Sequence, residues 1–238
     1  MRDNTIPAII LGVCLIVGLV GGGHYVEAAA RTWQAANRSV AVKGLAERDV
    51  PANLALWPLH FATSGDSLVA VQRQIDAQAQ AVRQFLHVAG FVDKEITLTS
   101  PQVTDEWANR PASQRGSADD RYKAEATMLV RTPKIQAVKK AMPRVGELIA
   151  HGVLLSPNYN YRTEFLFTDL NRIKPKMIAK ATANARAAAR QFAKDSGSRV
   201  GAIRHASQGY FSISDLDSYT PEVKKVRVVT TIDYALDD

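Results

Sequence analysis

The sequence predicts an α+β fold: mainly antiparallel sheets with amphipathic helices packed on one face, preceded by one N-terminal transmembrane helix. Two observations predict the folded part. Some segments alternate apolar and polar residues, as half-buried strands do, and others repeat apolar residues at three- and four-residue spacing, as helices do. Because most neighbouring strands are joined by turns too short for a crossover connection, we expect antiparallel pairing to dominate.

The third observation is an uncharged run of 18 residues near the N-terminus, Ile6 to Gly23. Its length reaches the lower edge of the ~17 to 25 residues that span a bilayer and exceeds that of most cleavable hydrophobic regions. We therefore expect a signal anchor within residues 1–30, followed by one α+β domain over residues 31–238. The open alternative is a signal peptide cleaved at the small residues Ala28 to Ala30.

Cysteine usage and charge limit the chemistry of the folded part. Cys14 is the only cysteine and lies in the apolar run, so residues 31–238 hold no disulfide, thiolate metal site or cysteine nucleophile. The formal net charge of +7 would attract phosphates or acidic polymers without specificity. The charges that flank the run, Arg2 before it and Arg31 and Arg38 after it, do not favour an outward-facing domain, but long domains translocate largely regardless of charge.

The first folded elements are two strands within residues 39–63, where apolar and polar residues alternate on both sides of a turn at residues 48–53. Pro58 indicates an edge or a bulge in the second strand, because proline cannot donate a hydrogen bond to a sheet. The sequence therefore predicts two strands separated by this turn.

A helix follows, because apolar residues recur at helical spacing over residues 68–89. Its candidate N-caps are Ser64 and Asp66, and Gly90 is its stop. The sequence EITLTSPQV, residues 95–103, is then predicted to be a strand.

Residues 105–121 form a polar stretch that is long for a loop in a compact domain. Residues 122–131 alternate as a half-buried strand. A second helix begins at Thr132 and ends at Gly152, and Pro143 is expected to interrupt it.

The last part of the chain begins with a predicted strand at residues 161–170. A long helix follows within residues 174–198. Two further strands, residues 202–213 and 223–236, complete the domain, and the second of them alternates regularly.

The long helix carries a uniform basic face. Its basic residues fall within a sector about 120° wide on a helical wheel: Lys176, Lys180, Arg186, Arg190 and Lys194. The opposite side is apolar and rich in alanine, and includes Phe192. This face is either an ordinary solvated surface or a candidate site for an anionic envelope polymer or lipid headgroups. Nucleic acid is not expected as a partner, because no aromatic residues alternate with the cations for base stacking.

The sequence contains no recognisable catalytic, metal-binding or cofactor-binding set. The five histidines lack metal-ligand spacing, and His60, beside Trp57 and Phe61, is expected to be structural. The carboxylates of the long polar stretch, Asp105, Glu106, Asp119 and Asp120, offer a weaker hydrolase-like alternative. We therefore expect a protein that is not an enzyme and that needs no cofactor.

Several segments resemble the SIMPL domain family of bacterial exported proteins. The resemblance is strongest over residues 170–213, where an Ala- and Arg-rich helix leads through a glycine turn into a strand. Residues 40–57 and 220–236 also fit, as the opening and closing strands of such a domain. The resemblance implies an α/β domain in the periplasm or on the cell envelope, a link to stress protection, and homo-oligomers in some members. It carries no active site onto this sequence.

Together these features predict a protein anchored in the inner membrane by its N-terminal helix, with its soluble domain in the periplasm. Cleavage of the segment and secretion to the periplasm is the alternative. The expected role is that of an oligomeric, non-enzymatic scaffold. The alternative role is a binding module that docks an anionic envelope component through the basic helix.

Overall fold

The computed structural model describes residues 12, 15–16, 18–27, 38–108, 121–156 and 161–237. The chain forms two compact units. Unit 1 comprises Met1–Glu47, Lys174–Phe211 and Arg227–Asp238, and unit 2 comprises Arg48–Ile173 and Ser212–Val226. Both units combine antiparallel strands with helices, which confirms the predicted α+β class.

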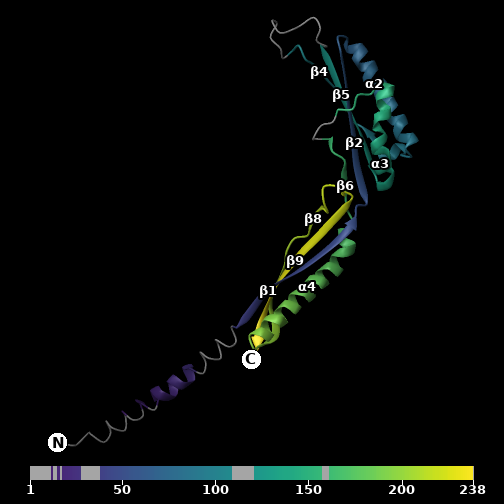
Figure 1. Cartoon of the computed structure of the whole chain (residues 1–238). Coiled ribbons are helices and arrows are strands. Elements are labelled where there is room, and N and C mark those ends of the chain that lie inside the picture. The colour runs from purple at the N-terminus through teal and green to yellow at the C-terminus, as the bar shows by residue number, and fades with distance from the viewer. Residues whose placement is uncertain are drawn as a thin grey trace, which may run out of the picture. The chain divides into compact units, whose positions relative to one another are not determined.

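Unit 2 is built on a five-stranded sheet of order β3-β5-β2-β6, with β4 also paired to β5. The strands are β2 (Leu54–Gly65), β3 (Ile96–Leu98), β4 (Gln102–Asp105), β5 (Tyr122–Thr132) and β6 (Glu164–Leu166). The central pair runs antiparallel without a register shift, so that His60 lies opposite Thr127. Helices α2 (Leu68–Val88) and α3 (Ile135–Ala141), with the 3₁₀ helix η3 (Met142–His151), cover one face of this sheet (Figure 1).

The core of unit 2 lies between that face and the helices. Alternate residues of β2 and β5 point into it and meet apolar residues of α2. Trp57 is the largest of them and contacts the rings of Phe85 and Phe91 edge-on, with centroids 6.5 Å and 6.1 Å away. Apolar residues recur every second position in the strands and about every 3.6 positions in the helix, so each element has one apolar face, and these faces meet in the core.

Unit 1 is built on the strands β1 (Ser39–Pro51), β9 (Val223–Asp237) and β7 (Arg199–Gln208), in the order β1-β9-β7. Helix α4 (Leu170–Asp195) lies along the sheet (Figure 1). Its small buried residues allow a close approach, and the core cluster consists of Val42, Ala185, Ala189, Ile232 and Tyr234. The short strand β8 (Ser212–Asp215), which belongs to unit 2, also pairs with β9.

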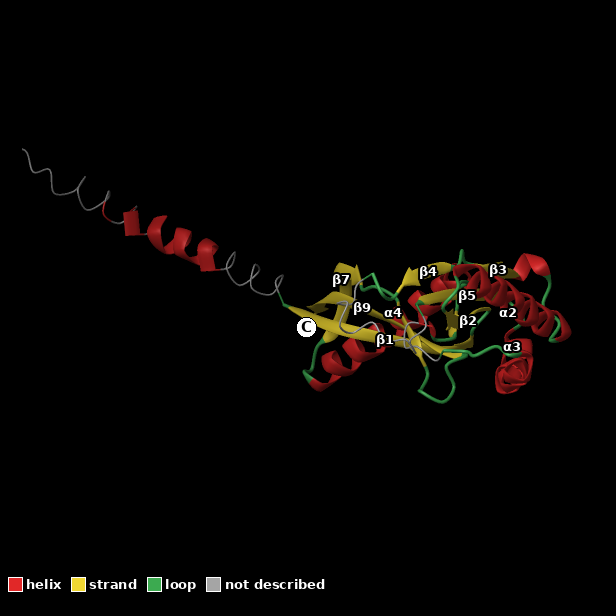
Figure 2. Cartoon of the chain, turned by 90° about the horizontal axis from the view of Figure 1, so that it is seen from above, coloured by secondary structure: helices red, strands yellow, loops and turns green. Residues whose placement is uncertain are grey.

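The structure contains one topology twice, although the sequence shows no repeat of fixed period. In chain order, β2-α2-β3-β4-β5 matches β1-α4-β7-β8-β9. In both sets the first strand lies beside the last, and the two strands after the helix pair with the other side of the last strand. Figure 2 shows the helices of both sets against their strands. The second set is inserted between β1 and α4 of the first.

Both long helices also end in the same way. Gly90 after α2 and Gly197 after α4 have positive φ angles of 94° and 69°. In each case the next residue donates its N–H five residues back, Phe91 to the Leu86 carbonyl and Ser198 to the Ala193 carbonyl. This is the Schellman arrangement, which glycine favours because it has no Cβ.

The structure confirms most predicted elements and corrects several details. β1 runs through Pro51, so the turn predicted at residues 48–53 is reduced to Ala52 and Asn53. The strand predicted at residues 161–170 is reduced to β6.

The N-cap of α2 is Ser67, whose Oγ accepts from the Ala70 N–H at 3.5 Å, so the prediction of Ser64 or Asp66 was wrong. The strand predicted at 95–103 is split into β3 and β4, and the strand predicted at 202–213 is split into β7 and β8.

The two proline predictions are confirmed. Pro143 lies where α3 gives way to the 3₁₀ helix η3. At Pro58, β2 pairs with β5 on one side, whereas β6 reaches only Leu54 to Leu56 on the other side. Proline therefore occupies a stretch of β2 that lacks a continuous second neighbour.

Among the described residues, no helix is both long and apolar enough to cross a membrane. Half of the predicted span, Ile6 to Gly23, lies outside the described residues. The N-terminal transmembrane helix therefore stays a prediction.

Candidate functional site

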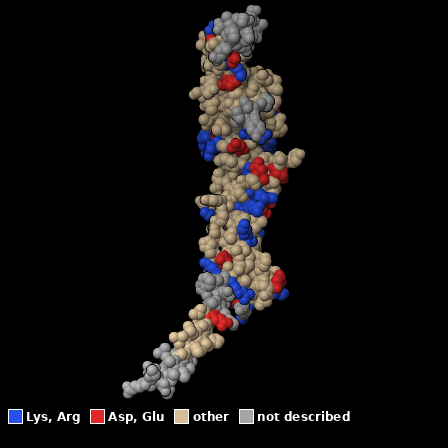
Figure 3. Space-filling model, turned by 90° about the vertical axis from the view of Figure 1, so that its left-hand side faces the viewer, with Lys and Arg blue, Asp and Glu red and all other residues tan. Residues whose placement is uncertain are grey.

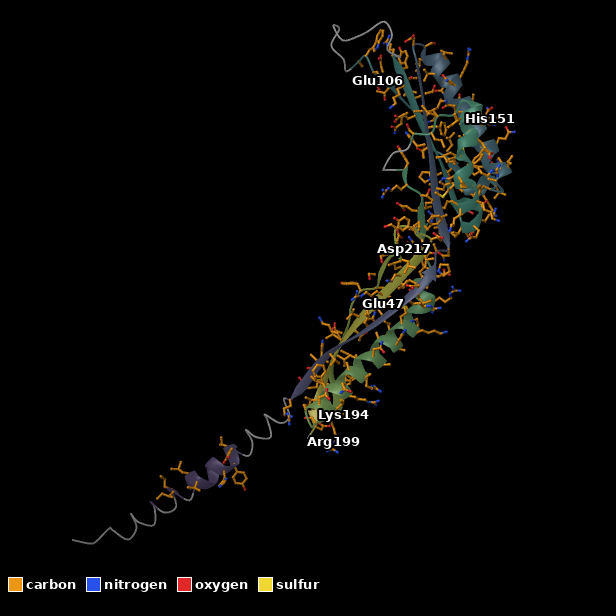
Figure 4. The ribbon with its side chains drawn as sticks, viewed as in Figure 1. Glu47, Glu106, His151, Lys194, Arg199 and Asp217 are labelled. Carbon is orange, nitrogen blue, oxygen red and sulfur yellow. The ribbon has the colours of Figure 1, made fainter. Side chains whose placement is uncertain are left out.

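The predicted basic face exists on α4. Its five residues, Lys176, Lys180, Arg186, Arg190 and Lys194, are all exposed, on the side opposite the buried alanines. Figure 4 shows Lys194 at the end of α4 and Arg199 at the start of the next strand. Within the described part of the chain, none of the five is ion-paired. Their charges are therefore available to an external anion.

The spacing of these charges indicates what they could contact. Lys176 and Lys194 lie 18 positions apart on one helix, which corresponds to about 27 Å. The five side chains form a line rather than a pocket, which suits an extended anionic surface better than one small ion. On the face of the molecule seen in Figure 3, lysine and arginine side chains alternate with acidic ones instead of forming one broad patch.

The apolar side of α4 is not completely buried. Phe192, predicted on the apolar side, is 61% exposed, while Ala189 and Ala193 are buried. Phe192 therefore lies on the predicted apolar side of the helix without being buried. Because Phe192 lies on the side of α4 opposite the basic row, it adds no apolar contact to that row.

The second candidate is strand β7, the edge of the unit 1 sheet. β7 pairs with β9 on one side, and among the described residues no strand pairs with its other side. None of its 10 residues is buried, and Ile203 is 47% exposed. Register shifts occur on both sides of Ile203, whereas His205 to Gln208 pair regularly with Asp233 to Thr230.

The third candidate is a polar pocket on the face of the unit 2 sheet that the helices leave open. His60 on β2 is 7% exposed, and its Nδ1 shares a hydrogen bond of 3.0 Å with Thr127 Oγ1. The Tyr161 ring stacks on the imidazole, with centroids 4.0 Å apart and planes 10° apart. Glu125, two residues before Thr127 on β5, is ion-paired to Lys123.

The electrostatics of this pocket keep its histidine neutral. Burial lowers the pKa of His60; the negative charge of Glu125 opposes this shift, and Lys123 reinforces it. The hydrogen bond and charge of Lys123 keep the pKa of Glu125 below its usual value. At neutral pH the pocket thus presents an uncharged imidazole and a carboxylate that is already paired.

The pocket has a volume of about 340 Å³. One wall comes from the break between β3 and β4. There Thr99 Oγ1 donates to the Thr127 carbonyl and accepts from the Thr127 N–H, both at 3.0 Å. The side chain thus replaces backbone pairing, and Ser100 and Pro101 leave the sheet before Gln102 rejoins it. This is why the predicted strand at 95–103 is split.

The base of the long polar stretch is held by an ion pair. The guanidinium of Arg121 donates two hydrogen bonds to Asp105 Oδ2, at 2.8 Å and 3.1 Å. The same guanidinium lies 5.7 Å and 4.9 Å from the ring centroids of Trp107 and Tyr122. Hydrogen bonding to Arg121 lowers the pKa of Asp105, so this carboxylate is ionised and engaged rather than a free acid. Asp119 and Asp120 lie outside the described residues.

Within the described residues, no group of three or more potential ligands is placed to hold a metal ion. The structure brings the five predicted basic residues onto one face. It also places His60 in a pocket that sequence reasoning missed. No sequence signal indicated that pocket, because Thr127 and Tyr161 are far from His60 in the chain and carry no motif.

Two comparisons with known proteins complete the description. The family model SIMPL, described as a protein of unknown function (DUF541), matches residues 40–231. The match covers β1 through most of β9 and includes both units. No protein with a curated description matches the chain.

Proposed function

The chain belongs to the SIMPL family, proteins of unknown function (DUF541), and from this premise we propose that it is a non-enzymatic scaffold that self-associates at the cell envelope. In this proposal the N-terminal segment anchors the chain in the inner membrane and the folded units lie in the periplasm, where the assembly has a protective role under stress. The observation that carries self-association is the open edge of β7.

Three edges of the two sheets differ in how well they are protected against pairing with a strand of another chain. In unit 2 the edge beside β5 consists of β3 and β4, which have 3 and 4 residues and are separated by residues 99–101. In unit 1 the outer edge of β1 is partly capped, because Asn184 Nδ2 donates to the Leu45 carbonyl at 2.7 Å. β7 is longer, with 10 residues, and none of them is buried. A long unpaired edge is a ready template for a strand of another chain.

The partner that this edge suits is a second copy of the chain. The unit 1 sheet has β1 at one edge and β7 at the other, so the β7 edge of one copy can pair with an edge strand of the next. The regular segment from His205 to Gln208 supplies backbone N–H and C=O groups for pairing with the second copy, and Ile203 adds apolar surface to this contact. Repeated head-to-tail pairing of this kind closes into a ring or grows as a filament.

Light scattering on the full-length protein in mild detergent tests the assembly. We expect a discrete oligomer, and we expect the double substitution Ile203→Lys with Ala206→Lys to lower its mass, because charges on an edge strand oppose pairing. Ile149→Lys is the matched control, since Ile149 is 66% exposed and lies on η3 of unit 2. A wild-type monomer at micromolar concentration would contradict the proposal.

Protease treatment of intact spheroplasts tests the location. A periplasmic domain is digested, whereas a domain that stays protected would refute the envelope assignment. Mass spectrometry of the purified chain distinguishes the retained anchor from the alternative of cleavage near Ala28 to Ala30.

A second candidate function is docking to an anionic envelope polymer or lipid headgroup. The five exposed, unpaired cations of α4 favour it, and no acidic partner among the described residues neutralises them. The test is salt-dependent sedimentation with anionic liposomes, comparing the wild type with Lys180→Glu, Arg186→Glu and Arg190→Glu combined. The control makes the same charge change on exposed residues of unit 2: Arg73→Glu, Lys94→Glu and Lys140→Glu. Equal losses in both triple variants would show a net-charge effect and exclude docking through α4.

A further inference from the structure

We propose that the polar pocket on the open face of unit 2 binds a neutral saccharide. The pocket is the one that His60, Thr127 and Tyr161 define between β2, β5 and the break in the β3–β4 edge. The proposal concerns unit 2 alone and is independent of self-association through β7.

The first argument is charge. Among the described residues that line the pocket, the single charged side chain is Glu125, and it is paired to Lys123. The buried His60 is uncharged at neutral pH, since burial lowers its pKa. A pocket without an unbalanced charge has no means of selecting a phosphate, a carboxylate or an ammonium group over water. Its ligand should therefore be neutral.

The second argument is the kind of polar group that lines the pocket. Thr99 and Thr127 supply hydroxyl groups that already share hydrogen bonds within the sheet. Ser100 supplies a hydroxyl group and Gln102 an amide that have no hydrogen-bond partner among the described residues, and both groups donate and accept. A ligand that matches them must also donate and accept at several neighbouring positions. Sugar hydroxyl groups do this, whereas a purely apolar ligand would leave these groups unpaired at a cost in free energy.

The third argument is the aromatic wall. The Tyr161 ring is partly exposed and is held in place because one of its faces stacks on His60, which is itself hydrogen-bonded to Thr127. The C–H groups on one side of a sugar ring carry slight positive charge and pack well against the electron-rich face of such a ring. A fixed aromatic ring beside a row of hydroxyl groups thus matches the two sides of a pyranose.

The size of the pocket agrees with this ligand class. Its volume of about 340 Å³ lies at the lower end of the range of about 300 to 1,000 Å³ for small-molecule sites, which suits one or two sugar rings. A neighbouring pocket of about 350 Å³ shares Pro58, His60 and Tyr161 and is lined mainly by apolar residues such as Met142 and Val145. Tyr161 therefore lines both pockets.

Saturation-transfer NMR on the full-length protein tests the proposal, in a detergent without a sugar headgroup, because an alkyl maltoside would itself compete. The neutral probes are maltose, cellobiose and N,N′-diacetylchitobiose, and the charged counterparts are glucosamine and glucuronate. We expect at least one neutral disaccharide to show transfer with a Kd of about 1 mM, as an open site with few polar contacts allows. We expect both charged sugars to bind more weakly.

Two variants locate the binding. Tyr161→Ala removes the aromatic wall and should weaken binding about tenfold, the loss expected for one aromatic contact. Gln102→Ala changes an exposed side chain and should weaken binding without affecting the fold. Tyr219→Ala is the matched control, since Tyr219 is 94% exposed and lies in a turn away from the pocket lining.

Three outcomes would overturn the proposal. The first is no transfer to any neutral sugar at about ten times the expected Kd, where a site would be nearly saturated. The second is tighter binding of either charged sugar than of the neutral disaccharides. The third is wild-type binding by both Tyr161→Ala and Gln102→Ala, which would place the sugar elsewhere on the chain.

Discussion

Replacing Gly44 with alanine should selectively destabilise unit 1, because α4 crosses β1 with almost no space between the two backbones. An added Cβ at position 44 would lie 1.9 Å from the Ala181 carbonyl oxygen and 2.5 Å from the Ala185 nitrogen. It would also lie 2.8 Å from the Ala185 Cβ. The atoms in the way are mainly backbone atoms of a helix, so no side chain can rotate to relieve the clash.

The distances give the size of the effect. To restore an ordinary carbon–oxygen contact, the helix must move away from β1 by about 1.3 Å, and a gap of about 0.5 to 1 Å already removes a quarter to a half of a dispersion contact. The cluster of Val42, Ala189, Ile232 and Tyr234 would loosen with it. Overpacking costs about 1 to 3 kcal/mol, and this case belongs near the upper end because the obstacle is rigid. The gain from replacing a strand glycine, about 0.5 to 1 kcal/mol, offsets part of it.

Hydrogen–deuterium exchange measured by mass spectrometry is the assay, because it reports α4 and α2 separately. A loss of about 2 kcal/mol should accelerate the exchange of protected α4 amides about 30-fold and leave the α2 amides unchanged. Gly146→Ala is the control, since no heavy atom lies within 4 Å of the Cβ that it adds. If Gly44→Ala leaves α4 exchange within about threefold of the wild type, the close packing of α4 on β1 is refuted.

Three further predictions concern buried polar groups. Glu95→Ala should lower the unfolding free energy by about 3 kcal/mol in urea titrations, because the carboxylate accepts from Thr132 Oγ1 at 2.7 Å and from Lys134 Nζ at 2.9 Å. Burial raises the pKa of Glu95, but hydrogen bonds from Thr132, Val92 and Lys134 outweigh it and lower the pKa. The wild type should therefore lose this stability as the pH falls below about 4.3 through the lower folded pKa, and Glu95→Gln should flatten the pH dependence in that window. Burial lowers the pKa of His60, so this side chain binds a proton more readily in the unfolded chain than in the folded one. The unfolding free energy should therefore fall as the pH drops below about 6.5. His60→Gln should remove this pH dependence. Tyr234→Phe should raise the unfolding free energy by up to about 1 kcal/mol and therefore raise the urea midpoint, because the Tyr234 hydroxyl is buried without a partner among the described residues. A lower midpoint would indicate an unseen partner.

The sequence by itself determined the kinds of elements and their faces. The alternation in residues 122–131 and 223–236 placed Ala124, Met128, Val228 and Ile232 on buried faces, because side chains of a strand alternate regardless of its neighbours. The basic row of α4 was equally predictable, since a helix places residues at fixed angles. Glycines after both long helices marked their ends, because the left-handed conformation they adopt favours glycine.

Features that depend on contacts between distant parts of the chain could not be predicted from the sequence. The division of residues 95–103 at Ser100 follows from the Thr99 side chain bonding to Thr127, a partner 28 positions away. The repeated β-α-β-β-β topology, the open edge of β7 and the pocket around His60 all follow from which strands pair. Apolar patterning sets which face of an element is buried, but it does not set which element covers that face. Only the tertiary structure decided that Tyr161 would lie on His60 and that no described strand would lie on β7.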